Sequence, residues 1–525
     1  MTTSLYITII IVMSSIIRVT KNNQVYVYES KSYWDKTKKA HRSKMVYLGK
    51  EDAFTKQIKA PGKQWYPKSS RDYGNVFLLD KISNYIGLTE ILKETFPDEW
   101  RKLITCAFFE VLEAKPLYLC GTWLESTYIN YVEKLPSQRI SELLKSVGEN
   151  EDARFKFSKL WSQKRGADRF IVFDITSISS YSKLIESVEW GYNRDKEKLP
   201  QINFGMVFGQ RTMLPIFYNV YQGSIRDVST LKNILKFLSL FKLSAVTFIL
   251  DKGFYSSDNI SELKRRKLHF IIPLTFRVDE AYKLIEKHQG KITDISNAIR
   301  VNKQILYCVR DKISINQYLL NAYIYFNKKK RVEDEERLLE KLMEAEEKVE
   351  QCHFRDREKL QKYIKEHAFE LKKFFIIRKV KGFFVLRRDK ERIERSIKQM
   401  GYVVMLSTRS MKAKEILLLY RNKDCVEKSF DNMKNELSSN RLRVHSRESM
   451  EGRLFISFLS LILYSFIHNI MREKNLVKKY TIEEVLYEIK KLKIIELENK
   501  RKILTEISKT QKELFMNLIN EVPKL

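Results

Sequence analysis

The sequence predicts an α/β protein whose central sheet is preceded by a small β-hairpin and a helical region and is interrupted by a long insertion. Strand-like and helix-like runs follow one another from Phe170 in the order βββαβαβ. This pattern breaks off over residues 276–400, and a second part of the same core is expected over 401–475. With 525 residues, 44% of them hydrophobic, the chain can bury one large core or several smaller ones.

The charge balance indicates a polyanionic partner. Lys and Arg number 97 against 65 Asp and Glu, a formal net charge of +32 that is spread over the whole length. Such a surplus favours a nucleic acid, although a ribosomal protein or a membrane-surface protein would also show it. The five cysteines are scattered, without the paired spacing of a zinc site or a disulfide framework. A reducing cytoplasm is therefore the expected compartment.

An apolar run near the start, over residues 5–13, ends by Arg18 and has no basic residue before it. The run is too short to span a bilayer. We expect either a buried first strand or an extension upstream of a start at Met13 instead of Met1, with a secretory signal as the alternative. No other segment is expected to approach transmembrane length, so no membrane partner is expected.

Residues 1–70 are expected to form a basic β module. Residues 24–30 alternate between apolar and polar side chains like a strand. The stretch 35–44 is strongly basic, and residues 45–50 have the pattern of a second short strand. A β-hairpin with a basic tip follows from this pattern.

Residues 71–165 are expected to be helical and helix-turn-helix-like. One helix starts at Pro136-Ser137 and ends near Gly148, and a second runs through Trp161. The first helix carries an apolar set: Ile140, Leu143, Leu144 and Val147. A DNA-end-binding region and an ordinary helical hairpin both fit. Basic side chains on the second helix favour DNA: Arg154, Lys156, Lys159, Lys164 and Arg165.

The segment 166–275 carries the first part of the predicted core. Its strands are expected over 170–173, which ends at Asp174, and over 201–209, 212–223, 245–250 and 268–272, with helices from Asp227 and Ser257. This is the order of elements in ribonuclease H-like folds, where the first and fourth strands lie side by side. The fourth strand ends at Asp251, so Asp174 and Asp251 would approach each other at one edge of the sheet.

The insertion over 276–400 contains a highly charged helix and basic strands. The helix has apolar positions at alternating spacings of four and three: Leu338, Leu342, Ala345, Val349 and Cys352. It is expected to pack on a partner helix or to protrude as an antiparallel hairpin. The strands over 374–388 would lie along DNA or form a solvated sheet face. The last segment, 476–525, is expected to be a C-terminal helical region.

A single helix is expected over 420–437, which lacks Gly and Pro. At about 100° per residue, four polar residues fall within roughly 60° of one another: Tyr420, Lys423, Glu427 and Lys434. An apolar stripe beside them would fix the helix against the sheet: Val426, Phe430, Met433 and Leu437. The polar set places a carboxylate between two cations and a phenol.

Three acids would converge in this fold: Asp174, Asp251 and Glu427. Each alone has an ordinary explanation as a turn or cap residue or as part of a solvated helix face, and Asp195, Asp227 and Asp258 are interpreted in that way. Together, the three acids supply carboxylate oxygens, which are the ligands that Mg²⁺ and Mn²⁺ prefer.

The chain resembles a DDE transposase of bacterial insertion sequences, in the group with a Tyr-x₂-Arg-x₃-Glu-x₆-Lys signature. Here the signature is Tyr420-x₂-Lys423-x₃-Glu427-x₆-Lys434. Further blocks that resemble the group are Phe173-Asp174-Ile175-Thr176-Ser177, Gly223-Ser224-Ile225-Arg226-Asp227, Leu250-Asp251-Lys252-Gly253-Phe254 and the stretch from Gly452 to Phe458. Lys423 departs from the group's arginine, and it keeps the charge but loses the two-pronged grip on phosphate.

The resemblance implies a mechanism. Two Mg²⁺ (or Mn²⁺) ions held by Asp174, Asp251 and Glu427 would support cleavage at the element's ends and strand transfer to target DNA, while Tyr420, Lys423 and Lys434 would bind phosphates. It also implies double-stranded DNA as partner, both inverted-repeat ends and target, a homodimer assembled on the ends, and a place at the nucleoid in the bacterial cytoplasm.

Three points stay open at this stage. Relatives cut the second strand through a DNA hairpin and hold a flipped base on a tryptophan of the insertion, but no tryptophan follows Trp190 here. A Phe or Tyr of the insertion would have to replace it.

Two alternative functions also stay open. One is a non-catalytic DNA-binding regulator derived from a transposase, and the other is a metal-dependent nuclease without strand transfer.

Overall fold

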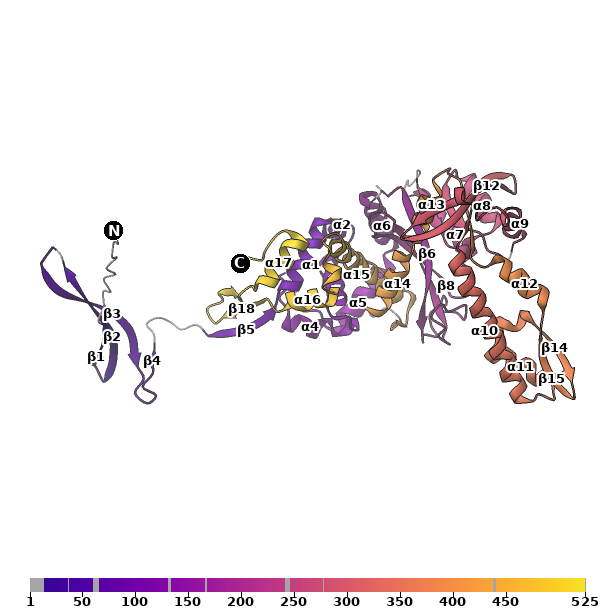
Figure 1. Ribbon diagram of the computed structural model, residues 1–525. Coiled ribbons are helices and arrows are strands. Elements are labelled where there is room, and N and C mark those ends of the chain that lie inside the picture. Colours follow the sequence, from indigo (N-terminus) through magenta and orange to yellow (C-terminus); the bar gives the residue numbers. More distant parts are fainter. Residues whose placement is uncertain are drawn as a thin grey trace, which may run out of the picture. The chain divides into compact units, whose positions relative to one another are not determined.

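The computed structural model describes residues 14–35, 37–59, 66–130, 134–165, 168–240, 246–276, 278–437 and 441–524. They form two compact units, which we describe separately (Figure 1). The smaller unit contains the described residues up to Arg71 and residues 493–506, and the larger unit contains 72–492 and 507–523. The apolar run over 5–13 and the choice between Met1 and Met13 lie outside the described residues.

The smaller unit contains two small sheets. One has four strands in chain order, each antiparallel to the next: β1 (Ser14–Lys21), β2 (Gln24–Asp35), β3 (Ala40–Glu51) and β4 (Ile58–Lys59). The other has the order β19-β18-β5: β5 (Pro67–Asp72), β18 (Lys493–Leu497) and β19 (Lys502–Leu504). We predicted a helical region over 476–525, but this segment also contains the strands β18 and β19. One of its strands, β18, pairs with β5, more than 400 residues earlier in the chain, and no local pattern reveals such a partner.

The larger unit is built on a ten-stranded mixed sheet. Five of its strands have the spatial order β8-β7-β6-β9-β10: β6 (Phe170–Ser180), β7 (Gln201–Gly209), β8 (Pro215–Gln222), β9 (Thr247–Leu250) and β10 (His269–Pro273). β9 is parallel to both β6 and β10, whereas β7 is antiparallel to its neighbours. The first and fourth strands are thus adjacent and parallel, as the order of elements predicts.

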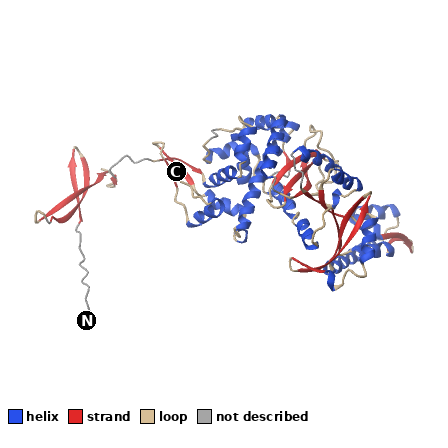
Figure 2. Ribbon diagram, turned by 90° about the horizontal axis from the view of Figure 1, so that it is seen from above, coloured by secondary structure: helices blue, strands red, loops and turns tan. Residues whose placement is uncertain are grey.

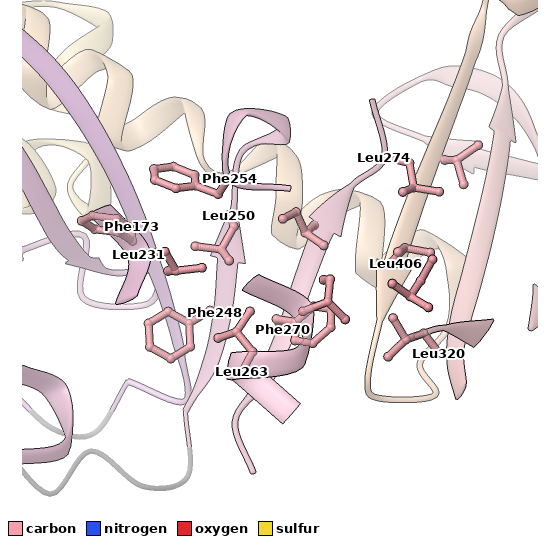
Figure 3. Packing of buried hydrophobic residues seen from close by; sticks show 14 of the residues in the cluster. Phe173, Leu231, Phe248, Leu250, Phe254, Leu263, Phe270, Leu274, Leu320 and Leu406 are labelled. Carbon is pink, nitrogen blue, oxygen red and sulfur yellow. The ribbon is translucent and has the colours of Figure 1, made fainter. Parts of the chain in front are cut away.

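Two helices cover one face of this sheet. α7 (Asp227–Leu240) and α8 (Ser257–Arg265) contribute Leu231 and Leu263 to a core whose strand residues include Phe248 and Phe270, all fully buried (Figure 3). α8 begins where the Ser256 side chain accepts a hydrogen bond from the backbone of Asn259, which satisfies one of the free N–H groups of the first turn.

The predicted insertion divides into two parts. Its beginning contains α9 (Asp279–His288) and three strands that extend the central sheet beyond β10: β11 (Ala298–Val301), β12 (Gln304–Ile315) and β13 (Tyr318–Phe326). β16 (Tyr402–Ser407) lies between β13 and β10 and is antiparallel to both. The chain therefore returns to the same sheet after its excursion.

The second part of the insertion has a hydrophobic core of its own. It contains α10 (Lys328–Cys352), α11 (Arg357–His367), the hairpin of β14 (Phe375–Val380) and β15 (Phe383–Arg388), and α12 (Lys390–Gln399). The predicted apolar positions Leu338, Leu342, Ala345 and Val349 are buried there, against residues of α11, β15 and α12. Cys352 is exposed, because the helix has already left this core at its last residue. α10 thus packs against the β14–β15 hairpin as well as α11 and α12, so the predicted packing on a partner helix describes only part of its surroundings.

The helical region packs around one long apolar helix. This helix is α15 (Arg447–Glu473). Four helices of the bundle contact it: α1 (Gly74–Tyr85), α3 (Trp100–Glu113), α5 (Ser137–Glu149) and α17 (Lys509–Ile519). The bundle also includes α2 (Leu88–Thr95), α4 (Cys120–Ser126), α6 (Glu151–Arg165) and α16 (Ile482–Lys490). Figure 2 shows this bundle as a dense group of blue helices beside red strands. The predicted apolar set of α5 is buried in it.

By its length and composition, α15 could cross a membrane. We had expected no segment after the first apolar run to approach transmembrane length, and this expectation was wrong. However, 78% of its most apolar window is buried inside the protein. The core helix of a folded domain has the same length and composition, so this helix is weak evidence for a membrane span.

Several basic residues that favoured DNA recognition by α6 are engaged within the protein. Arg154 donates to the carbonyl oxygen of Val147 at 2.7 Å and lies 3.7 Å from a carboxylate oxygen of Glu451. Lys156 and Lys164 pair with acids of α2, at 3.2 and 3.3 Å. These contacts hold the helices of the bundle together, so the basic character of α6 does not by itself indicate a DNA-binding surface.

Candidate active site

Two neighbouring strands bring the first two carboxylates together. The prediction that the first strand ends at Asp174 was wrong, because β6 continues to Ser180 in its pairing with β7, and Asp174 lies within it at the level where β9 ends. The parallel register of β6 and β9 pairs Phe173 with Leu250. Asp174 and Asp251 are the next residues on each strand, so they lie at the same level. The side chain of Asp174 is 14% exposed and that of Asp251 is 34% exposed.

The predicted single helix over 420–437 was wrong. α13 (Ala413–Arg421) ends and α14 (Asp424–Asn435) begins on either side of a tight turn, in which the backbone N–H of Lys423 donates to the carbonyl oxygen of Tyr420 at 3.0 Å. The turn contains neither Gly nor Pro, and all of its residues tolerate helical torsion angles. The sequence therefore gives no sign that the helix ends here. The turn removes the basis for projecting Tyr420 and Lys423 onto the same helix as Glu427.

α14 is nevertheless held as its apolar stripe predicts. The four stripe residues are between 0% and 5% exposed: Val426, Phe430, Met433 and Leu437. Through this buried face α14 packs against β6 and α15. Glu427 lies beside this stripe, about 100° around the helix from Val426, and its carboxylate reaches the ammonium of Lys423.

Lys423 lies among all three carboxylates. Its Nζ atom is 3.4 Å from Asp174 Oδ2, 3.6 Å from Asp251 Oδ2 and 3.1 Å from Glu427 Oε1. Burial acts to lower the pKa of Lys423, but the three acids outweigh it and raise the pKa. Burial also raises the pKa of Asp174, while the nearby ammonium acts in the opposite direction. The acids therefore surround one cation already.

The other two members of the predicted polar set have different partners. Tyr420 donates its hydroxyl hydrogen to Asp251 Oδ1 at 3.0 Å, and burial together with this acid raises the pKa of the phenol. Lys434 is 7% exposed, and its Nζ atom lies 2.5 Å from Asp195 Oδ2. Tyr420 therefore belongs to the carboxylate cluster, whereas Lys434 secures a loop beside it.

The donor set fits a hard divalent cation. Asp174, Asp251 and Glu427 offer only carboxylate oxygens, which is the ligand type of Mg²⁺ and Mn²⁺, and all three are already grouped around a positive charge. Within the described residues, no group of three or more Asp, Glu, His or Cys side chains is close enough to hold a metal ion without rearrangement. The three acids contact the ammonium of Lys423 instead.

The transposase DDE domain family matches this chain over residues 165–463, more than half of its length and the whole range that supplies the acids. The chain belongs to this family. It is therefore a DDE transposase by descent. No curated protein matches the sequence significantly. Among matching solved structures is a cryo-EM structure of a piggyBac transposase synaptic complex with hairpin DNA, at 11% identity and a TM-score of 0.34, covering 78% of this chain and 70% of that one.

Three of the sequence blocks that resemble DDE transposases meet beside the acids of this transposase. Gly253 follows Asp251 by two residues, and a Cβ atom added to it would lie 3.2 Å from Asp227 Oδ2. Phe254 packs its ring 5.1 Å from that of Phe173. Asp227 begins α7 and forms an ion pair with Arg194. The blocks thus share one contact region, although they are separated along the sequence.

Sequence reasoning missed the role of the loop over 181–200. Arg194 pairs with Asp227, and Asp195 pairs with Lys434, so two residues of this loop contact elements on both sides of the carboxylates. The only signal was the length of the segment between two strands. Asp195 and Asp227 are thus ion-pair partners and not simple turn residues, whereas Asp258 lies in the first turn of α8 behind the capping Ser256.

Proposed function

We propose that this transposase binds the ends of an insertion sequence, cleaves DNA there and joins the freed ends to target DNA by a two-metal-ion mechanism. One observation carries the proposal: three carboxylates from two strands and a helix surround a single cation position in a chain of the transposase DDE family. The strand order β8-β7-β6-β9-β10, with β9 parallel to both neighbours, supports a ribonuclease H-like core.

In the proposed mechanism, Asp174, Asp251 and Glu427 hold two divalent ions. When bound, such ions lower the pKa of the attacking water or 3′-hydroxyl and stabilise the leaving oxygen. The Tyr420 hydroxyl orients the Asp251 carboxylate through its hydrogen bond. Lys423 neutralises the acids before DNA arrives. Once divalent ions neutralise these acids instead, the ammonium of Lys423 is free to contact a DNA phosphate.

Double-stranded DNA, as inverted-repeat ends and as target, is the proposed partner. The formal charge of +32 provides the attraction to phosphates. Two copies of the chain would act together on the paired ends, in the bacterial cytoplasm at the nucleoid. Lys434 contributes indirectly, because it fixes the 181–200 loop through Asp195.

The test is cleavage and joining, with Mg²⁺ or Mn²⁺, of labelled DNA fragments taken from both regions that flank the gene, where the ends of the element would lie. Asp174→Ala, Asp251→Ala and Glu427→Ala should each abolish both reactions, because every acid is needed to hold the ions. Binding of the fragments in a gel shift should persist.

Asp258→Asn is the matched control, since this carboxylate lies in the first turn of α8, away from the cluster around Lys423. It should retain cleavage. Robust cutting by Glu427→Ala would refute the site. Cleavage without a joined product would identify a nuclease, and end binding without cleavage by the unchanged protein would identify a regulator.

A further inference from the structure

One end of the four-stranded sheet is a two-stranded ribbon. β2 and β3 pair as far as Asp35 and Ala40, which adjoin the turn between them. Within the described residues, β1 pairs with β2 no further than Lys31, and β4 pairs with the opposite end of β3. We call residues 31–35 and 40–44 the β2–β3 ribbon.

A β-bulge and a fixed turn set the shape of this ribbon. The register of β2 and β3 shifts between Val27 and Tyr28, and such a shift bends a strand pair and increases its right-handed twist. At the tip, Asp35 Oδ1 accepts hydrogen bonds from the backbone N–H of Thr37 at 3.0 Å and from that of Lys38 at 3.2 Å. The tip is therefore held by its own hydrogen bonds.

The β2–β3 ribbon carries a dense positive charge. Residues 31–44 contain six Lys and Arg and one acid. Lys31 lies directly opposite Lys44, and like charges at such positions destabilise a strand pair. Glu29 offsets part of this repulsion, because its carboxylate lies 3.3 Å from the ammonium of Lys31. A bound polyanion would remove the rest, so this surface fits an anionic partner.

One face of the ribbon places an arginine between these lysines and the tip. Directly opposite residues share a face, and so do residues two positions apart on one strand. Tyr33 and Arg42 are opposite each other, two positions nearer the tip than the lysines. Tyr33 is 48% exposed, and the Arg42 side chain is 50% exposed although it lies 3.8 Å from Asp35. The face thus offers a guanidinium flanked by two ammonium groups.

The cations of α6 are placed differently. Arg154, Lys156 and Lys164 form ion pairs with acids of neighbouring helices in the bundle. Recognition of DNA needs cations that can leave water for phosphates and base edges. The exposed ribbon meets this condition better than the helix pair over 137–165, to which the sequence pattern assigned the recognition of DNA ends.

We propose that the β2–β3 ribbon enters the major groove at the element's ends and recognises their base sequence. The inference rests on the proposed function in that the chain binds those ends. The major groove of B-DNA, about 12 Å wide, admits a two-stranded β-ribbon and presents a different pattern of donors and acceptors for each base pair. Arg42 contacts a guanine edge with its two-pronged guanidinium, while Lys31 and Lys44 extend from the two strands toward phosphates on either side of the groove.

The test is a gel shift with the full-length protein and no added metal, so that binding is measured apart from the carboxylate chemistry. Probes are labelled fragments from both regions that flank the gene and a fragment of equal length from inside it. Arg42→Lys should lower the preference for the flanking fragments about tenfold, because the ammonium keeps the charge but loses the two-pronged bond. Lys44→Gln should weaken both kinds of fragment alike and reduce the slope of log affinity against log salt by about one.

Lys21→Gln is the matched control, since Lys21 is an exposed cation at the far end of the same sheet, beside the turn between β1 and β2. It should keep the preference of the unchanged protein. Methylation of guanine N7, which lies in the major groove, should block binding of the flanking fragments, and Arg42→Lys should lose this sensitivity at one guanine.

Two results would overturn the role of the ribbon while leaving the proposed function intact. One is an undiminished preference of Arg42→Lys for the flanking fragments. The other is interference only from methylation of adenine N3, which lies in the minor groove. If the unchanged protein showed no preference for the flanking fragments, the proposed binding of the element's ends would fail, and the role of the ribbon with it.

Discussion

At the residue scale, Lys423 occupies the position for which a divalent ion would compete. Its ammonium lies within 3.6 Å of all three carboxylates and is nearly inaccessible to solvent, with the side chain 6% exposed. Two positive groups cannot neutralise the same oxygens at once without repelling each other. Lys423 thus controls how strongly the metal-free site attracts a metal ion.

We therefore expect Lys423→Met to lose stability without metal and to gain more than the unchanged protein when Mn²⁺ or Mg²⁺ is added. Three unneutralised carboxylates repel one another, and the apparent metal affinity should rise roughly tenfold or more, about 1.4 kcal/mol. Unfolding temperature measured against metal concentration checks this, because a ligand of the folded state raises it by mass action.

Lys434→Met provides the control for that experiment. Lys434 is equally buried but pairs with Asp195, outside the carboxylate cluster. It should lose stability without the added response to metal. If Lys423→Met responded to metal no more than Lys434→Met, the ammonium and the ion would not share the site.

At the element scale, the crossing of α5 and α15 depends on two glycines, one on each helix. A Cβ atom added to Gly148 would lie 1.7 Å from the carbonyl oxygen of Glu448, and one added to Gly452 would lie 2.0 Å from that of Leu144. The backbones therefore touch without side chains between them. Gly452 belongs to a block that resembles the transposases, and its position explains why a small residue is needed there.

Gly452→Ala should destabilise the protein by about 2 kcal/mol or more, because the methyl group forces the two helix backbones apart in a packed bundle. Urea unfolding measures the change. Gly290→Ala is the control, since nothing lies within 4 Å of a Cβ atom added at that position. Equal stability of the two variants would show that the helices separate without cost.

At the scale of the whole molecule, the beginning of the chain is strongly basic. Residues 1–59 carry eleven Lys and Arg against four Asp and Glu. Among the residues that the structure describes, their four-stranded sheet pairs with no strand outside itself. The helices over 74–165 instead cover α15. Removing all of residues 1–165 would therefore expose an apolar helix, so a shorter deletion is the informative one.

We expect the chain without residues 1–59 to stay folded and to bind DNA more weakly and with a shallower dependence on salt. Each phosphate contact releases condensed counterions, so fewer cationic contacts reduce the slope of log affinity against log salt. Binding of an end fragment is measured for both proteins across ionic strength. An unchanged slope would assign the phosphate contacts to the larger unit, and a flat slope in the full chain would refute the polyanion interpretation.

The sequence by itself determined the features that depend on local pattern. The βββαβαβ order, the position of Asp251 after its strand, the apolar stripe from Val426 to Leu437 and the buried positions of α10 all follow from periodicity, and the observed elements agree with them. The first strand is the exception, because β6 continues past Asp174 to Ser180. Periodicity reports which face of an element is buried, because burial is repeated at every turn or every second residue.

Only the tertiary structure decided what distant segments do to one another. The helix ends and a new one begins at Lys423, whose ammonium lies between the acids; Lys434 pairs with the 181–200 loop; and β18 lies beside β5. These outcomes depend on side chains far apart in sequence that meet only after folding. Local propensity carries no record of such partners, because the free energy of each contact is set by the surroundings in which it is buried.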